Sequence, residues 1–344
     1  MATPPEPPDL AAAHYDQVAA TIRAIVEQIQ EVWRTLTAES VEDALLGEVG
    51  AQIAAAAVAG QLSVAEAAHA YVAAQMAAQG GMALAQAVLL PPLIPSAFTG
   101  FAPGGGPLES LLFLPAIGVR RRLAAGLPQE EAMIGGLVDM TMYAATAIAD
   151  TARTADQVAM AAHPQCVAYM RVVRLPACSR CIILSGQMYT RSEGFLRHPN
   201  CDCQTLPLRE HEWPGVDSPQ QLFDQLDKEQ QQRAFGVAGA RAIRAGGDIG
   251  QVVNARRGMD TVHIYGRTLH ATHEGATRRS VYGRSRDRAG DDFARFAGQR
   301  YGQATSMRYF RSTRSPRLMP EEIFRLADDR DHELRLLRRN GYIV

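Results

Sequence analysis

Four of the five cysteines fall within 26 consecutive positions, and one histidine lies among them. Cys178 and Cys181 are separated by two residues, His198 and Cys201 have the same separation, and Cys203 follows two positions later. A two-residue spacer lets a tight turn direct two ligands at one ion, and zinc prefers four sulfur or imidazole ligands in a tetrahedron. The spacing therefore predicts a structural zinc ion (Zn2+), with five candidate ligands for four places.

Three other interpretations of this cluster stay open: an unmetallated thiol or apolar knuckle, a redox dithiol and a catalytic zinc ion. A redox Cys-x-x-Cys favours the start of a helix that follows a strand, whereas residues 182–184 are expected to lead into a turn at 185–186. A catalytic zinc needs an open position and a general base, and only Glu193 is near in sequence. We expect no catalytic residue in the cluster, and we expect Cys166 to be a packed thiol.

The elements that position this cluster are expected to be mostly helices. Alanine is crowded into the first 160 residues, and aromatic residues are only 6% of the chain, which favours helix over sheet. Ser63 is expected to begin one helix as its N-cap, with Glu66 in the capping box, and residues 91–107 are expected to form a loop. Apolar periodicity predicts helices over 9–37, 39–59, 63–88, 108–125 and 128–161.

Short strands are expected on both sides of the cysteines, at 167–175 and 205–208. Helices are predicted at 218–234, with Ser218 as N-cap and Pro219 in the first position, and at 237–245 and 248–256. The fold class is therefore α+β, mainly α. The expected domains are an Ala-rich helical N-terminal domain (1–162), a small α/β domain with the zinc knuckle (163–260) and a basic C-terminal extension with a terminal helix (261–344).

Several other classes of protein are disfavoured. The uncharged run 67–108 is broken by glycines and prolines, so no membrane span is expected, and the proline-rich and acidic start does not resemble a signal peptide. Gly104–Gly106 lack the lysine and the strand-helix setting of a phosphate loop. No serine or histidine lies in a nucleophile-elbow context. We therefore expect no small-molecule substrate.

Three motifs carry a resemblance to a known family: Cys178-x-x-Cys181, the step Leu184-Ser-Gly186, and Phe195-x-x-His198-Pro-Asn-Cys201-x-Cys203. They resemble the signature of the Mu F-like phage head morphogenesis domain. The usual motif has arginine where this chain has Asp202, which leaves the ligands intact but puts any role of that arginine in doubt.

Later segments are similar to minor capsid proteins of actinobacterial phages, so that the resemblance covers most of 110–344. These segments are 218–230, 239–256, 316–324 and 336–343. The resemblance implies a minor head component that binds the phage portal protein or the major capsid protein. It implies a place in the virion, in the capsid interior or at the portal vertex, and in the host cytoplasm during assembly. Head assembly, with DNA packaging or ejection, is the implied function.

Two alternatives to an assembly role remain: a capsid maturation protease, because related proteins often carry that label, and a DNA-binding ejection protein. The net charge of −1 conceals about −10 for 1–160, +1 for 161–250 and +8 for 251–344. An arginine run could neutralise the phosphates of packaged DNA, although a solvated or capsid-facing surface is the simpler interpretation. This run consists of Arg278, Arg279, Arg284, Arg286 and Arg288.

Overall fold

Long helices dominate the computed structural model, which places them in the first of two compact units. The described residues are 6–82, 93–191, 194, 203–209, 216–264, 267–272, 274 and 316–343. They are mainly helical, with small antiparallel sheets, which confirms the predicted class of mainly α within α+β. The first unit is Met1–Arg174 with Ser185–Val216, and the second is Leu175–Leu184 with Asp217–Val344. The predicted domain ranges, which follow chain order, stay a prediction.

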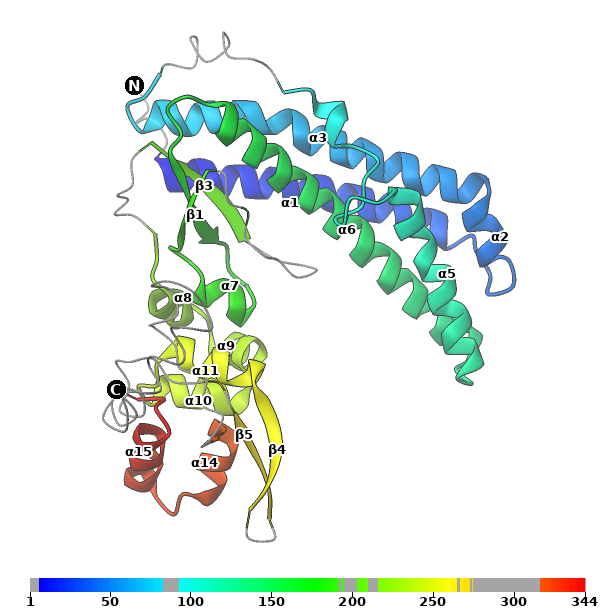
Figure 1. Ribbon diagram of the computed structural model, residues 1–344. Coiled ribbons are helices and arrows are strands. Elements are labelled where there is room, and N and C mark those ends of the chain that lie inside the picture. Colours follow the sequence, from blue (N-terminus) through cyan, green and yellow to red (C-terminus); the bar gives the residue numbers. More distant parts are fainter. Residues whose placement is uncertain are drawn as a thin grey trace, which may run out of the picture. The chain divides into compact units, whose positions relative to one another are not determined.

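Five helices build most of the first unit (Figure 1). They are α1 (Pro7–Trp33), α2 (Val41–Leu46), α3 (Glu48–Ala78), α5 (Leu108–Ala124) and α6 (Gln129–Ala162). Small residues let them approach closely: a Cβ on Gly136 of α6 would lie 2.5 Å from Val119 of α5 and 2.7 Å from the Trp33 ring of α1. Close packing of this kind is felt at the level of a single methyl group. The core of the first unit therefore depends on close steric fit between helices as well as on buried apolar surface area.

The predicted helix break before Ser63 is wrong. Residue 63 lies inside α3, and the chain breaks instead at Gly47, whose backbone is non-helical (φ −106°, ψ −146°). The Ser63 and Glu66 side chains were expected to accept hydrogen bonds from backbone N–H groups at a helix start. Those N–H groups instead bond to carbonyl groups of the preceding turn, because the helix is continuous there. Gln61, two positions earlier, bonds through its side chain to Phe101 O and Gly100 N of the following loop, at 2.8 Å each. Tertiary packing therefore overrides the capping-box pattern.

A three-stranded antiparallel sheet with the order β2-β1-β3 completes the first unit. Its strands are β1 (Ala168–Val173), β2 (Met188–Thr190) and β3 (Cys203–Leu208). The register pairs Ala168 with Leu208 and Val173 with Cys203, so β3 is an edge strand that begins at a candidate ligand. Tyr169, Leu206 and Leu208 are fully buried against side chains of α3 and α6, including those of Tyr71 and Met160.

The second unit is built from short helices: α7 (Ser179–Ile183), α8 (Pro219–Gln225), α9 (Lys228–Phe235), α10 (Val237–Arg244) and α11 (Ile249–Arg257). The predicted capping box at Ser218 is confirmed, with Pro219 in the first position. The single helix expected over 218–234 is corrected to α8 and α9. The chain is extended at Leu226, and Asp227 begins the new helix with a second capping box to Gln230.

The rest of the second unit contains an element that the periodicity did not indicate. The strands β4 (Met259–Ile264) and β5 (Arg267–Thr272) form a hairpin, extended by the two residues of β6 (Arg317–Leu318). The helices α14 (Pro320–Leu326) and α15 (Arg330–Arg339) follow. Arg241 of α10 pairs with Glu333 of α15 and lies over the Phe324 ring of α14, which ties these helices together.

Within the described part of the chain, α6 is long and apolar enough to cross a membrane by length and composition. It packs against α3 and α5 in the first unit. Core helices of water-soluble proteins meet the same criterion. The expectation that no segment spans a membrane therefore stays a prediction.

Candidate metal centre

The turn at Cys178 brings two sulfur atoms together. Cys178 is the N-cap of α7, and its sulfur accepts a hydrogen bond from the backbone N–H of Cys181 at 3.4 Å. The two sulfur atoms are also 3.4 Å apart. Cys181 is fully buried, whereas Cys178 is partly exposed. One short turn therefore brings two sulfur ligands together, and a backbone N–H of the same turn donates to one of them.

This pair fits a zinc ion by donor type and by distance. Two thiolates on one tetrahedral zinc lie about 3.8 Å apart when each Zn–S bond is about 2.3 Å. The observed 3.4 Å between the Cys178 and Cys181 sulfurs needs only a small adjustment to reach that separation. The N–H group that points at the Cys178 sulfur also favours the anionic sulfur that a metal requires. The turn can thus supply half of a tetrahedral site.

One argument made from the sequence against a redox dithiol is wrong. Residues 182–184 were expected to lead directly into a turn, but the Cys-x-x-Cys motif opens a helix that follows β1 in the chain. That helix has only 5 residues, so its dipole is small and gives little stabilisation to a thiolate at its start. The expected turn does follow, with Gly186 at φ +77°. The dithiol interpretation therefore stays open beside the structural zinc.

Cys203 lies in the other compact unit, at the start of β3, where two buried arginines hold it. The Nε–H of Arg171 on β1 donates to the Cys203 sulfur at 2.9 Å, and the Nε–H of Arg153 on α6 donates to the Cys203 carbonyl at 2.9 Å. The exposed fractions of Arg171 and Arg153 are 2% and 6%. Cationic donors stabilise negative charge on sulfur. The position of this sulfur is therefore set by two elements at once.

Side chains from the helices cover the outer edge of β3 along its length. Beyond the Arg153 contact, the Tyr71 hydroxyl on α3 donates to Thr205 O at 2.6 Å, and the Gln79 side chain donates to Pro207 O at 2.8 Å. These alternate carbonyls point away from β1, and an edge strand left bare is a site of unwanted pairing. The helical bundle thus supplies hydrogen-bond donors to the carbonyl groups on the free edge of β3.

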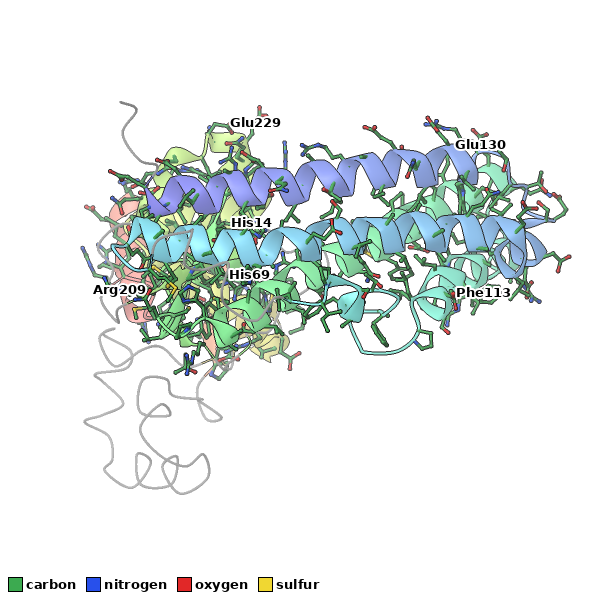
Figure 2. The ribbon with its side chains drawn as sticks, turned by 90° about the horizontal axis from the view of Figure 1, so that it is seen from above. His14, His69, Phe113, Glu130, Arg209 and Glu229 are labelled. Atoms are coloured by element: carbon green, nitrogen blue, oxygen red, sulfur yellow. The ribbon has the colours of Figure 1, made fainter. Side chains whose placement is uncertain are left out.

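A histidine on α1 forms a buried polar cluster in the same unit. The Nε2 atom of His14 lies 3.1 Å from Asp156 Oδ2, with side-chain exposures of 3% and 0%. The His14 ring stacks on Tyr71 with centroids 3.9 Å apart. Figure 2 shows His14 and His69 toward the same end of the bundle as Arg209, with Phe113 toward the other end. Tyr71 connects this cluster to the sheet, because its hydroxyl donates to Thr205 O of β3.

Burial shifts the pKa of three groups in the first unit. Desolvation raises the pKa of the Cys166 thiol to about 11, which confirms the expected packed thiol. Desolvation, with Asp156 nearby, holds the pKa of Tyr71 well above its usual value. Burial, and then the neighbouring His69, lowers the pKa of His163. These shifts favour the neutral form of each group.

The remaining predicted site residues are two candidate ligands and the arginine run. His198 and Cys201 lie outside the described residues, as do Arg278, Arg279, Arg284, Arg286 and Arg288. Among the residues that are described, no group of three or more His, Cys, Asp or Glu side chains is arranged to hold a metal ion. The expected zinc site therefore stays a prediction.

Sequence reasoning missed the arginines and the histidine cluster. One signal was available for Arg171, because an arginine inside the apolar run 167–175 must find a partner when the strand is buried. A second was available for His14, which falls with Pro7, Ala11 and Val18 on the buried face of α1. Nothing in the sequence indicated the partners.

Comparison of the chain with known protein families, with curated proteins and with solved structures gave no match.

Proposed function

We propose that this chain is a phage minor capsid protein that acts in head assembly and carries a structural zinc ion. The observation that supports it best is the Cys178 turn, in which two sulfurs lie 3.4 Å apart and a backbone N–H points at one of them. The ligand spacing that follows this turn, through Cys203, resembles that of the Mu F-like domain.

In this proposal Cys178 and Cys181 hold the zinc ion together with two of His198, Cys201 and Cys203. When bound, the ion supplies free energy of folding, because the ligands converge only in the folded chain. The backbone N–H of Cys181 orients one sulfur, and the guanidinium groups of buried arginines offset negative charge at Cys203 if that sulfur is the fourth ligand. A closed site of four protein ligands leaves no position for substrate or water.

The proposed partners are the phage portal protein and the major capsid protein. The acidic segment 1–160 is the surface proposed to dock on them, and the basic segment 251–344 is proposed to face packaged DNA during packaging or ejection. The protein would then be found in the virion, in the capsid interior or at the portal vertex, after assembly in the host cytoplasm.

Mass spectrometry of purified particles tests the assembly role. The full-length chain should persist at low copy in mature particles of the virus that encodes it. Particles assembled with the Cys178→Ser variant should lose the chain or assemble poorly, whereas Cys166→Ser, in a plain packed thiol, should be tolerated. Absence of the chain from both procapsids and mature particles would refute a structural role in the head.

The alternative function, a capsid maturation protease, needs a nucleophile and a base. Among the described residues of the helical unit, the His14–Asp156 pair meets part of that requirement, since a carboxylate lies beside an imidazole there. However, no described serine or cysteine hydrogen-bonds to His14, and the pair is buried. His69→Ala should leave processing of the major capsid protein unchanged. Loss of that processing on substitution of a single serine or histidine would favour the protease.

A further inference from the structure

Helix α5 exposes an apolar seam on the side away from its core. Ser110, Leu114, Ile117, Arg121 and Ala124 are all exposed and recur at intervals of four, three, four and three residues. Leu114 and Ile117 in its middle are 42% and 41% exposed. The opposite side of the helix is buried against the rest of the first unit. Exposed positions with this period and an apolar middle are typical of a helix that pairs with a second helix.

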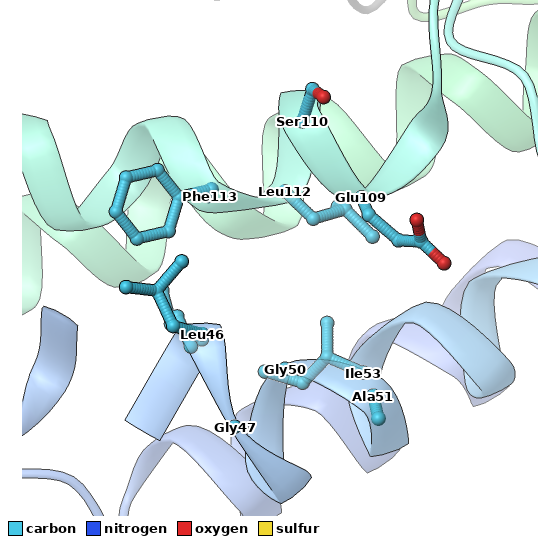
Figure 3. Close-up of a pocket in the computed structure, with 10 residues that line it drawn as sticks. Leu46, Gly47, Gly50, Ala51, Ile53, Glu109, Ser110, Leu112 and Phe113 are labelled. Carbon is cyan, nitrogen blue, oxygen red and sulfur yellow. The ribbon is translucent and has the colours of Figure 1, made fainter. Parts of the chain in front are cut away.

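A groove of about 460 Å³ adjoins this seam where α5 meets α2 and α3. Figure 3 shows Phe113 and Leu46 facing each other across one end of the groove, with Glu109 at the other end. Leu46 is 71% exposed. Small residues of α3 form the opposite side, and a Cβ on Gly50 would lie 1.9 Å from the Leu45 carbonyl oxygen. The seam therefore borders a recess that can accept apolar side chains.

The two ends of α5 carry opposite charges. Glu109 lies in its first turn, and Arg121 lies in its last turn. Neither side chain has an ion-pair partner within the described part of the chain, whereas the neighbouring Arg120 is paired with Glu42 at 2.8 Å. An acidic start, an apolar middle and a basic end make this surface complementary to a copy of itself in the opposite direction.

We infer that this seam is an interface between two copies of the chain, in which the two α5 helices pack antiparallel about a two-fold axis. Leu114 of each copy then packs against Ile117 of the other, and Glu109 of each lies beside Arg121 of the other. A two-fold interface is self-complementary in this way, because each contact occurs twice. The inference goes beyond the proposed function and does not depend on the zinc ion.

The oligomeric state of the full-length chain tests this inference first. Sedimentation equilibrium should show a dimer of the 37.3 kDa chain that dissociates on dilution. Ile117→Ser should weaken the dimer at least about tenfold, because the lost contact is central and occurs twice. Val237→Ser is the matched control, since Val237 is 67% exposed but lies on α10. It should leave the dimer unchanged.

Charge reversal then tests the antiparallel arrangement. Glu109→Arg and Arg121→Glu should each weaken association, because each variant places like charges together at both ends of the interface. An equimolar mixture of the two variants should restore association, since the mixed pair regains opposite charges at both ends. A parallel pair of helices has like charges at both ends even in the unchanged chain, so it predicts that neither single variant weakens association. High salt should reduce the difference between the variants and the mixture.

Three results would overturn the inference. One is a monomer at all concentrations. Another is an oligomer that neither Ile117→Ser nor the charge reversals affect. The third is a monomeric chain that binds neutral phosphatidylcholine vesicles through the seam, so that Ile117→Ser abolishes flotation. None of these results bears on the zinc content of the chain.

Discussion

The helices of the two compact units are stabilised in different ways. In the first unit, α1, α3 and α6 have 27, 31 and 34 residues, and none begins with a side-chain cap. In the second unit, α8, α9, α11 and α15 have 7 to 10 residues, and each begins with a side chain that accepts a backbone N–H. Helices shorter than about 12–15 residues are marginal alone. Local caps are therefore common among the short helices of the second unit, although α10 and α14 begin without one.

Polar side chains have a different task in the first unit. They bind backbone carbonyl groups far away in the sequence, as Tyr71 does for Thr205 O and Arg153 for Cys203 O. In the second unit, the capping residues bind N–H groups three positions away. The cysteine turn belongs to this local class, because the Cys178 sulfur occupies the place of a capping oxygen. The difference predicts which substitutions are costly and where.

The largest effect is expected from His14→Ala in the first unit. This change leaves the fully buried Asp156 carboxylate without its imidazole partner, and breaking a buried pair costs about 3–5 kcal/mol. Urea unfolding followed by the fluorescence of the buried Trp33 should show it. His69→Ala, at a half-buried histidine on α3, is the control and should change stability little. Equal stability of both variants would show that the pair contributes nothing to the unit.

Tyr71→Phe should have the next largest effect. It removes one hydroxyl, keeps the ring that stacks on His14, and leaves the buried Thr205 carbonyl unsatisfied, at a cost of about 1–3 kcal/mol. Hydrogen exchange should rise in β3 and β1 and stay unchanged in α9. Tyr143→Phe, on α6, serves as the control. Unchanged exchange in β3 would contradict the role of Tyr71 as an edge cap.

A cap in the second unit gives a smaller and more local effect. Asp227→Ala removes the acceptor for Gln230 N at 2.8 Å, and losing such a cap costs about 1 kcal/mol. Exchange should rise at the start of α9 and leave α3 unaffected. Arg233→Ala, on the exposed side of the same helix, should have a negligible effect. An equal effect of both changes would argue that α9 depends on composition and not on its cap.

The smallest effect is a pH dependence at His163. Burial lowers the pKa of this histidine in the folded chain, so the unfolded chain binds the extra proton more readily. Stability of the first unit should therefore fall as the pH drops through the ordinary histidine pKa of about 6.5 and level off below the folded value. His163→Asn should flatten this dependence between pH 7.5 and pH 5. An unchanged slope would place the pH dependence at other groups.

The sequence predicted most helices but not where two of them break. Apolar periodicity is strong over α1, α5 and α6, and their ends agree within a few residues. The break expected at Ser63 failed because packing continued the helix through it. The break at Asp227 was missed, although the spacing of Asp227 and Gln230 carries the same capping-box signal as that of Ser218 and Gln221.

The candidate site also has one part that the sequence predicted and one part that it did not. Local spacing was enough to predict that Cys178 and Cys181 lie in one tight turn. The contacts around Cys203 join residues that are 50 and 32 positions apart, and single-sequence periodicity has no signal for such pairs. Local chemistry was thus accessible from the sequence, whereas the long-range polar contacts were not.

The most direct test of the central proposal is the metal content of the purified chain. The reduced protein, isolated without chelator, should hold about one zinc ion per chain by elemental analysis and native mass spectrometry. Cys178→Ser should release the zinc and increase exchange at 166–208, whereas Cys166→Ser should retain it. No metal in reducing buffer, with full protection of 166–208 from exchange, would contradict the structural zinc.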